Sequence, residues 1–241
     1  MMWWLGLLGG TAWAAESSSA MPALGDLFQG GLASHNMMAL VALVSVLSLA
    51  PSLLVVLTSF TRLVVVFSFL RNAMGLQQSP PNTVFISLAL FLTAFIMEPQ
   101  FTSAYNQGVR PYLEKKLDEK TAFEKTVDPF ARFMQAHVRE KDVGLFLDVA
   151  KVPAPATIEA TPLRVLVPAF MISELRRAFE IGFLLFLPFL VIDLVVASVL
   201  MSLGMMMLPP ATVSFPLKLV FFVLVDGWHM LVGSLVKGYS A

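Results

Sequence analysis

The chain has 241 residues, of which 57% are hydrophobic and only 13% are charged, and its mean hydropathy is +0.79. A soluble domain usually carries about 25% charged residues, so this much apolar surface needs a bilayer or partner subunits to cover it. The net charge is zero and cysteine is absent, which argues against nucleic-acid binding and excludes disulfides and cysteine metal sites.

The first 14 residues, MMWWLGLLGGTAWA, predict a signal peptide. Their apolar stretch ends at Ala12-Trp13-Ala14, a small-residue pattern typical of signal cleavage, and polar residues follow. As a helix they would reach about 21 Å, less than the ~30 Å hydrocarbon core, which favours a cleaved signal over a retained anchor. We therefore expect cleavage after Ala14 and a polar extracytoplasmic lead over residues 15–36.

Residues 37–97 predict a first apolar helical hairpin. Residues 37–60 are uncharged and long enough to span a bilayer, with a bend expected at Pro51. Glutamines and prolines make a turn over 77–81, and a shorter apolar run over 83–97 ends at Glu98-Pro99.

Arg62 and Arg71 lie within this hairpin, with no acidic residue near them in the sequence. Their simplest interpretation is as positive-inside signals that place their loop in the cytoplasm. That orientation would put the residues that follow the hairpin outside the cytoplasm.

Residues 98–163 mix basic and acidic side chains and predict a small extracytoplasmic helical insert. Two amphipathic helix faces are expected from apolar spacing; they are Phe130, Phe133, Met134 and His137, and then Val143, Phe146, Leu147 and Ala150. Asp142 is the expected N-cap of the second helix. About 66 residues could barely form an independent core.

Residues 164–236 predict a second apolar hairpin, followed by a short tail over 237–241. Pro188 and Asp193 interrupt its first arm, and Pro216 and Lys218 its second. A charge at the bilayer centre costs about 2.5–3.5 kcal/mol, so neither charged side chain should face lipid.

The turn of this hairpin, residues 204–210, reads GMMMLPP. Its glycine frees the backbone and its two prolines forbid helix continuation, so the chain must reverse here. Met205, Met206 and Met207 are soft side chains that conform to irregular neighbours. From the residues alone, a turn buried against a neighbour and a pore constriction that excludes water are both open.

Four charges of the second hairpin need partners. We expect Glu174 and Lys218 to form an ion pair, within one chain or between neighbouring chains; the alternative is that Lys218 extends to the interface while Glu174 is solvated. Asp193 and Asp226 could be imagined as an intramembrane acid pair, but structural partners for a base or a helix end are favoured.

Each apolar segment is short, or carries a proline or a charge near its middle. Isolated spans of this kind would be poorly matched to lipid. The sequence therefore predicts an all-α membrane protein of two long bent helical hairpins and a small insert, assembled with sister subunits into a helical ring.

Catalysis is poorly supported by the sequence. His35, His137 and His229 lie far apart, and the chain contains no HExxH, G-x-S-x-G or P-loop motif. We expect no enzyme activity, no cofactor and no metal. A small-molecule or ion transporter would also use broken helices with intramembrane charges, but no convincing inverted repeat relates 37–97 to 168–236.

Four stretches closely resemble the FliP family of flagellar protein-export gate components: LTSFTRLVVVFSFLRNAMGLQQSPPN, RVLVPAFMISELRRAFEIGF, LPFLVIDLVVASVLMSLGMMMLPP and FPLKLVFFVLVDGW. The similarity covers about residues 39–236, and a similar counterpart serves virulence secretion systems. A signal sequence favours the flagellar branch.

The resemblance implies a pore-forming, non-enzymatic subunit of the export gate. It implies a homo-oligomeric ring, expected to be a pentamer, with FliR, FliQ and FlhB, in the inner membrane at the flagellar basal body. Much of the chain would lie on the periplasmic side, and unfolded flagellar proteins would pass through. Met205, Met206 and Met207 would form a gasket, and Glu174 and Lys218 an intersubunit ion pair.

Overall fold

The computed structural model describes residues 55–76, 80–153, 155, 157–205 and 207–239, and five helical positions between residues 37 and 48. The chain divides into two units, Met1–Pro51 and Ser52–Ala241, and α3 to α10 belong to the second. The expected signal peptide, its cleavage after Ala14, the lead over 15–36 and the bend at Pro51 lie outside the described residues.

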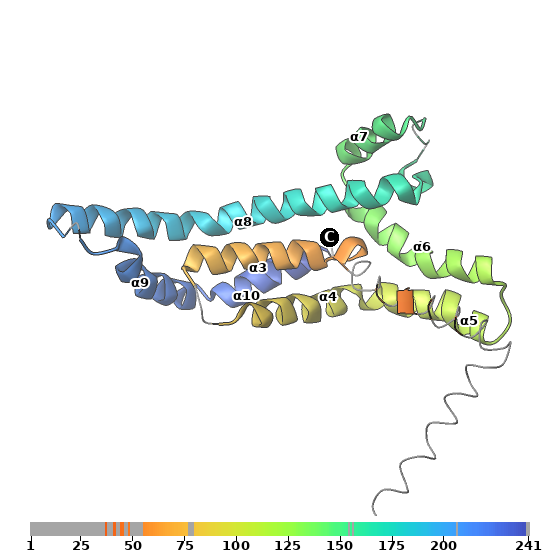
Figure 1. Cartoon of the computed structure of the whole chain (residues 1–241), viewed down its shortest axis with the longest axis horizontal. Helices are drawn as coiled ribbons and strands as arrows, with labels where there is room; N and C mark the ends of the chain where they lie inside the picture. Colours follow the sequence, from red (N-terminus) through yellow and green to blue (C-terminus); the bar gives the residue numbers. More distant parts are fainter. Residues whose placement is uncertain are drawn as a thin grey trace, which may run out of the picture. The chain divides into compact units, whose positions relative to one another are not determined.

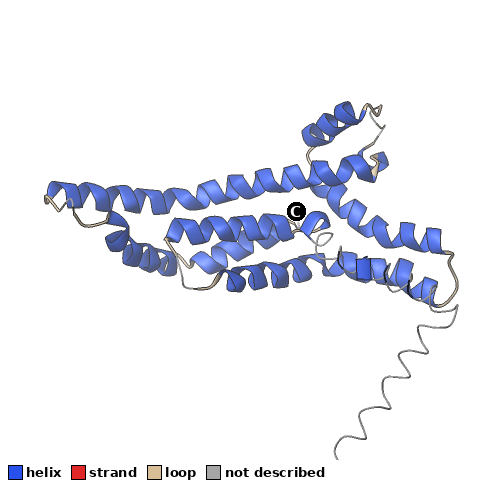
Figure 2. Ribbon diagram, in the orientation of Figure 1, coloured by secondary structure: helices blue, strands red, loops and turns tan. Residues whose placement is uncertain are grey.

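Every regular element of the described part is helical (Figure 2), so the prediction of an all-α chain is confirmed. In chain order they are α3 (Phe60–Met74), α4 (Asn82–Ala104), the π-helix η1 (Tyr105–Val109), α5 (Arg110–Leu113), α6 (Glu119–His137), α7 (Glu140–Ala150), the 3₁₀ turn η2 (Ile158–Ala160), α8 (Leu163–Ser202), α9 (Pro210–Leu224) and α10 (Gly227–Lys237).

The first hairpin is formed by α3 and α4. α3 ends at Gly75, whose φ of +75° is readily adopted only by glycine. The N–H groups of Gly75 and Leu76 bond to the carbonyls of Asn72 and Arg71, both at 3.1 Å, which satisfies the last carbonyls of the helix. Pro81 then directly precedes α4, whereas residues 77–79 of the expected turn lie outside the described residues.

The sequence predicts that the apolar run ends at Glu98-Pro99, but α4 does not end there. It runs to Ala104 and continues through η1 and α5, so that Asn82–Leu113 is one helical segment of 32 residues. Pro99 removes one backbone hydrogen bond, but α6 packs along this stretch and offsets that loss. The rings of Phe101 and Phe130, for example, meet edge-on with centroids 5.5 Å apart.

α6 and α7 make up the insert, and their predicted apolar faces are largely confirmed. Phe133, Met134 and His137 are buried on α6, and Val143 and Leu147 are buried on α7. Phe130 and Phe146 are half-buried, whereas Ala150 is exposed.

The expected N-cap of α7 is wrong. Arg139 occupies the cap position, and Asp142 lies buried in the first turn of the helix. The reason is tertiary: the Asp142 carboxylate is held by Ser173 of α8, whose hydroxyl lies 2.6 Å from Asp142 Oδ2.

α8 is a single helix of 40 residues that passes through Pro168 and Pro188 without a break (Figure 1). At 1.5 Å per residue it is about 60 Å long. Asn82–Leu113 and Leu163–Ser202 are each long and apolar enough to cross a membrane. α9 and α10 would together make a third such segment, bent by 61°, and Asp226 lies at the bend with a φ of +51°.

The core has two parts, and α8 contributes to both. The first joins α8 to α3, α4, α9 and α10, and includes Leu63, Phe67, Ala89, Phe189 and Phe222. The second joins α8 to α4, α6 and α7, and includes Met97, Phe133, Leu147, Leu166 and Phe170. Among its described residues, the insert therefore shares its core with the long helices and has no separate one, in accord with its small size.

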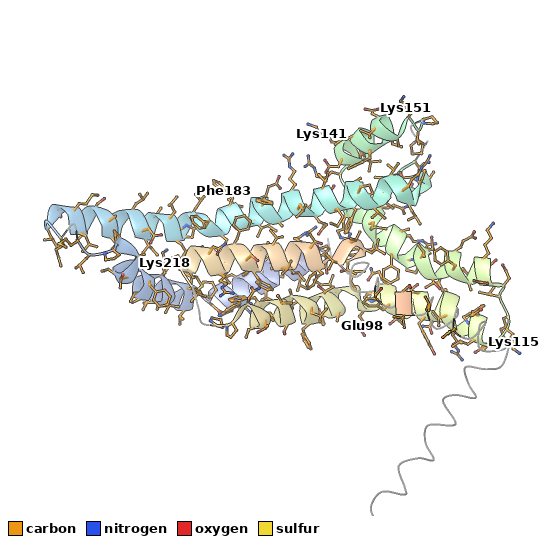
Figure 3. The ribbon with its side chains drawn as sticks, viewed as in Figure 1. Glu98, Lys115, Lys141, Lys151, Phe183 and Lys218 are labelled. Carbon is orange, nitrogen blue, oxygen red and sulfur yellow. The ribbon has the colours of Figure 1, made fainter. Side chains whose placement is uncertain are left out.

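Much of the outer surface of α8 is nevertheless apolar and exposed. Phe183, labelled in Figure 3, is 62% exposed and projects away from α3. Leu184, Val191, Leu194, Val195 and Val199 are also exposed. An uncovered apolar row of this length needs lipid or protein around it.

Candidate functional site

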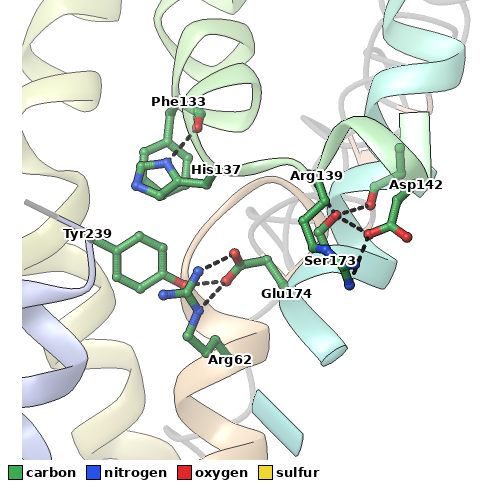
Figure 4. Close-up of polar contacts among 9 residues, drawn as sticks. Arg62, Phe133, His137, Arg139, Asp142, Ser173, Glu174 and Tyr239 are labelled. Carbon is green, nitrogen blue, oxygen red and sulfur yellow. Dashed lines mark hydrogen bonds and ion pairs between the residues drawn. The ribbon is translucent and has the colours of Figure 1, made fainter. Parts of the chain in front are cut away.

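Two polar clusters interrupt the apolar body, and each contains charges singled out from the sequence. We call the first the Arg62 junction; it consists of Arg62, Phe133, His137, Glu174 and Tyr239 (Figure 4). We call the second the Lys218 clamp; it consists of Ala73, Asp193, Ser214 and Lys218.

Arg62 and Glu174 form a bidentate ion pair at the centre of the junction. Arg62 Nε donates to Glu174 Oε2 at 2.9 Å, and Arg62 Nη2 donates to Oε1 at 2.5 Å. Their side chains are 2% and 0% exposed. α3 packs along α8, which brings together two charges that are 112 positions apart. Such a buried pair is tolerable only because its geometry and hydrogen bonds are complete.

Tyr239, just beyond α10, closes the junction. Its hydroxyl donates to Glu174 Oε2, and its ring lies 3.8 Å from the Arg62 guanidinium carbon, a cation–π contact. The same ring stacks on Phe133 and contacts His137, with centroids 5.6 and 5.0 Å apart. Burial, and then the negative charge of Glu174, raise the pKa of the Tyr239 hydroxyl well above its usual range, so it remains a donor at neutral pH.

Ser173, next to Glu174 on α8, anchors the insert. Its hydroxyl oxygen lies 2.6 Å from Asp142 Oδ2 and accepts from the Arg139 N–H at 3.1 Å. Both Ser173 and Asp142 are buried. Two consecutive residues of α8 therefore hold different partners, since Ser173 holds α7 and Glu174 holds α3.

The Lys218 clamp ties α9 to α8 and α3. Lys218 Nζ lies 2.6 Å from Asp193 Oδ2 and donates to the Ala73 carbonyl at 2.9 Å. Ser214, one turn before it on α9, donates to Asp193 Oδ1 at 2.6 Å. The Ala73 carbonyl is near the C-terminal end of α3, where the helix dipole favours a cation. Lys218 is only 6% exposed, so these contacts satisfy its charge.

The structure does not bring Glu174 and Lys218 together in one chain. Glu174 is occupied by Arg62 and Tyr239, and Lys218 by Asp193 and Ala73. The predicted pair is replaced within the chain by two separate pairs, because α3 rather than α9 covers the Glu174 side of α8. A pair between subunits would require both side chains to leave these partners.

The methionine turn lies at the end of the α8–α9 hairpin. Gly204 has a φ of +70°, and the Met205 N–H bonds to the Leu200 carbonyl at 3.0 Å, which closes the end of α8. Met205 is 44% exposed and Met207 is 98% exposed, while Met206 lies outside the described residues. The described methionines therefore pack little against their own chain.

Two other charges singled out from the sequence, Arg71 and Asp226, lie at helix ends. Arg71 Nε donates to the Leu76 carbonyl at 3.1 Å, in the turn after α3. Asp226 is exposed and precedes α10, whereas Asp193 belongs to the Lys218 clamp. Among the residues that the structure describes, no group of three or more histidine, cysteine or acidic side chains could hold a metal ion.

Tyr239, Ser173, Ser214 and the role of Asp142 were missed by sequence reasoning. Hydroxyls are common in apolar helices, and their spacing carries no signal for a distant partner. The tail over 237–241 did contain one aromatic residue, Tyr239, which was the only available hint that it packs against the core.

Comparison with known proteins decides the family. The family model described as the FliP family matches residues 43–235. The chain belongs to the FliP family. As a FliP family member it is a component of the flagellar export apparatus, a structural membrane protein and not an enzyme.

Relatives named "Flagellar biosynthetic protein FliP" are similar over most of this chain. The protein of Caulobacter vibrioides is 57% identical over 215 residues, which cover 89% of this chain and 81% of the relative. The proteins of Agrobacterium fabrum and Bacillus subtilis are 50% and 49% identical, and the matches cover 82% and 83% of this chain and 82% and 90% of those relatives.

Proposed function

We propose that this FliP family chain is the core pore-forming subunit of the flagellar export gate. In this role, copies assemble into a ring, with five subunits expected, and unfolded flagellar proteins pass through its centre. FliR, FliQ and FlhB are the proposed partners within the same complex.

The observation that carries the proposal is the exposed methionine turn at the end of a long apolar hairpin. Met207 is almost fully exposed, and Met205 is nearly half exposed. Removal of a large apolar side chain from water is favourable, so we expect a neighbouring molecule to cover these methionines. Turns from several copies that meet on one axis would form a soft apolar collar that excludes water and ions and conforms around a passing chain.

The long helices also support assembly over a solitary membrane protein. α8 is about twice as long as the ~30 Å hydrocarbon core, and its exposed apolar side chains lie mainly in its second half, from Phe179 to Met201. A bilayer can surround only about half of a helix of this length, and sister subunits would pack along the rest. We propose that the complex lies at the inner membrane, at the basal body, with the insert and much of the chain on the periplasmic side.

The N-terminal segment fits the same proposal. Cleavage of a signal peptide after Ala14 would leave the new N-terminus outside the cytoplasm. Arg71, in the last turn of α3, would then lie on the cytoplasmic side with the methionine turn, in accord with the positive-inside rule. N-terminal sequencing of the purified chain would test this step.

An ion-leak measurement tests the pore role. Replacement of Met205, Met206 and Met207 by alanine should raise ion conductance through the assembled complex, because alanine leaves the collar too wide. Replacement of all three by leucine should leak much less, since leucine retains apolar bulk. Met201→Ala is the matched control, because Met201 is 61% exposed but lies on α8 before the turn.

Assembly must be measured in parallel, by co-purification of the subunits in mild detergent. A triple alanine variant that assembles normally and shows no added leak would contradict the collar. An equal leak in Met201→Ala would show that the effect is not specific to the turn.

A further inference from the structure

Tyr239 contacts three helices to which it does not belong. Its hydroxyl reaches Glu174 on α8, its face covers Arg62 on α3, and its ring packs against Phe133 and His137 on α6. Figure 4 shows these side chains converging on one point. The position of one ring is therefore coupled to the contact between the insert and the first hairpin.

A cavity of about 560 Å³ lies beside this ring, between α4, α6 and the end of α10. Tyr239, His137 and Gln100 are among the residues that line it. The Gln100 side-chain oxygen is buried and has no hydrogen-bond partner. An unpaired buried acceptor is costly, and a phenol hydroxyl is a suitable donor for it. The cavity thus provides room beside the Tyr239 ring, and its lining contains an acceptor without a partner.

We propose that Tyr239 is a two-position latch of the Arg62 junction. In the closed position, seen here, its hydroxyl bonds to Glu174 and its ring covers Arg62. In the open position the ring turns into the cavity and its hydroxyl bonds to Gln100. Opening uncovers the buried Arg62–Glu174 pair and breaks the present stacking of the ring on Phe133, so the second part of the core becomes accessible while the first part stays closed.

The absence of cysteine from the chain makes a direct test possible. Ala169 on α8 is fully buried in the second part of the core, and Ala89 on α4 is fully buried in the first. A single cysteine at either position, in native membranes that contain the whole complex, reports local opening through its rate of reaction with N-ethylmaleimide. Ala169→Cys is the reporter and Ala89→Cys is its matched control.

Three latch variants are then compared on each reporter. Tyr239→Leu removes the hydroxyl and the aromatic face, and should raise the Ala169→Cys rate about tenfold or more. Tyr239→Phe keeps the ring and should raise it less. Gln100→Leu removes the acceptor of the open position, and should lower the rate about two- to tenfold below that of the unaltered latch.

The Ala89→Cys rate should remain unchanged in all three variants. Equal Ala169→Cys rates in all variants would overturn the latch. Parallel increases at both reporters would overturn it too, because they would show general loosening of the fold. A rate that does not fall in Gln100→Leu would remove the open position, and with it the two-position proposal.

Discussion

Lys218 Nζ on α9 lies 2.6 Å from Asp193 Oδ2 on α8, and the same ammonium group donates to the Ala73 carbonyl at the end of α3. One side chain therefore fixes three helices near the end of the molecule that carries the methionine turn. Its charge is satisfied within the chain. A Lys218 variant should therefore be restored by a charge reversal at Asp193, its partner within the chain, and not at Glu174.

Lys218→Glu should disrupt the clamp, because it places two carboxylates side by side. The expected loss of folding stability is about 1.5–3 kcal/mol, the usual contribution of a hydrogen bond to a charged partner. The loss is no larger because Asp193 is partly exposed to solvent. A second change, Asp193→Lys, should restore part of the loss, whereas Glu174→Lys should not. Recovery of the assembled complex and of swimming motility would measure both. Rescue by Glu174→Lys alone would instead favour the intersubunit pair.

Glu174→Gln should be among the most destabilising single changes in the chain. It leaves the Arg62 guanidinium buried without a charged partner, which typically costs about 3–5 kcal/mol. Glu180→Gln is the matched control on the same helix, because the Arg176–Glu180 pair is exposed and such pairs contribute only about 0–1 kcal/mol. Thermal unfolding in detergent would compare them. Equal melting temperatures for the two variants would contradict the role of the junction.

Gly108→Ala should weaken the contact between η1 and α6. A Cβ at this position would lie 2.1 Å from Thr126 Oγ1 and 2.9 Å from the Ala122 carbonyl oxygen, so the helices must separate. Overpacking of this kind costs about 1–3 kcal/mol. Gly144→Ala on α7, where a Cβ meets nothing within 4 Å, should instead be neutral or stabilising. A melting temperature for Gly108→Ala at or above that of the unaltered chain would contradict the close approach.

The contribution of Tyr239 to the stability of the folded chain should decline at alkaline pH. The pKa of its hydroxyl is raised in the folded chain, so the folded state holds this proton more tightly than the unfolded state does. Its contribution is therefore fully present below the unfolded tyrosine pKa of about 10 and declines as pH rises above it. The stability difference between the unaltered chain and Tyr239→Phe should narrow from about pH 10 upward.

Tyr105→Phe provides the control for that titration, because Tyr105 is 52% exposed. Its difference in stability from the unaltered chain should be small, because substitution of an exposed side chain usually changes stability by only about 0.5 kcal/mol or less. A Tyr239→Phe difference that is constant with pH would show that the hydroxyl makes no contribution of this kind.

The parts of the fold that depend on local spacing could be predicted from the sequence. The apolar repeat of Phe133, Met134 and His137 is a property of one helix, and it correctly identified the buried face of α6. The reversal between α8 and α9 likewise follows from a glycine and two prolines within seven residues.

The polar partners could not be predicted, because they depend on which helices become neighbours. Arg62 and Glu174 are 112 positions apart, and Asp142 and Ser173 are 31 apart. Pro99 shows the same limit for helix ends, since a strong local breaker was outweighed by packing against α6. Sequence spacing recognised Glu174 and Lys218 as costly charges, but it could not choose among their possible partners.

The length of α8 has a consequence for how the chain enters a membrane. The charges Glu174, Arg176, Arg177 and Glu180 occupy its first half, whereas residues 181–202 contain only Asp193. That second half is about 33 Å long, close to one hydrocarbon thickness. In a newly made copy, we therefore expect only the second half of α8 to lie in the bilayer, while the first half lies outside it. Under the proposed ring assembly, such a chain is an assembly intermediate, and we expect it to be degraded where other subunits are scarce.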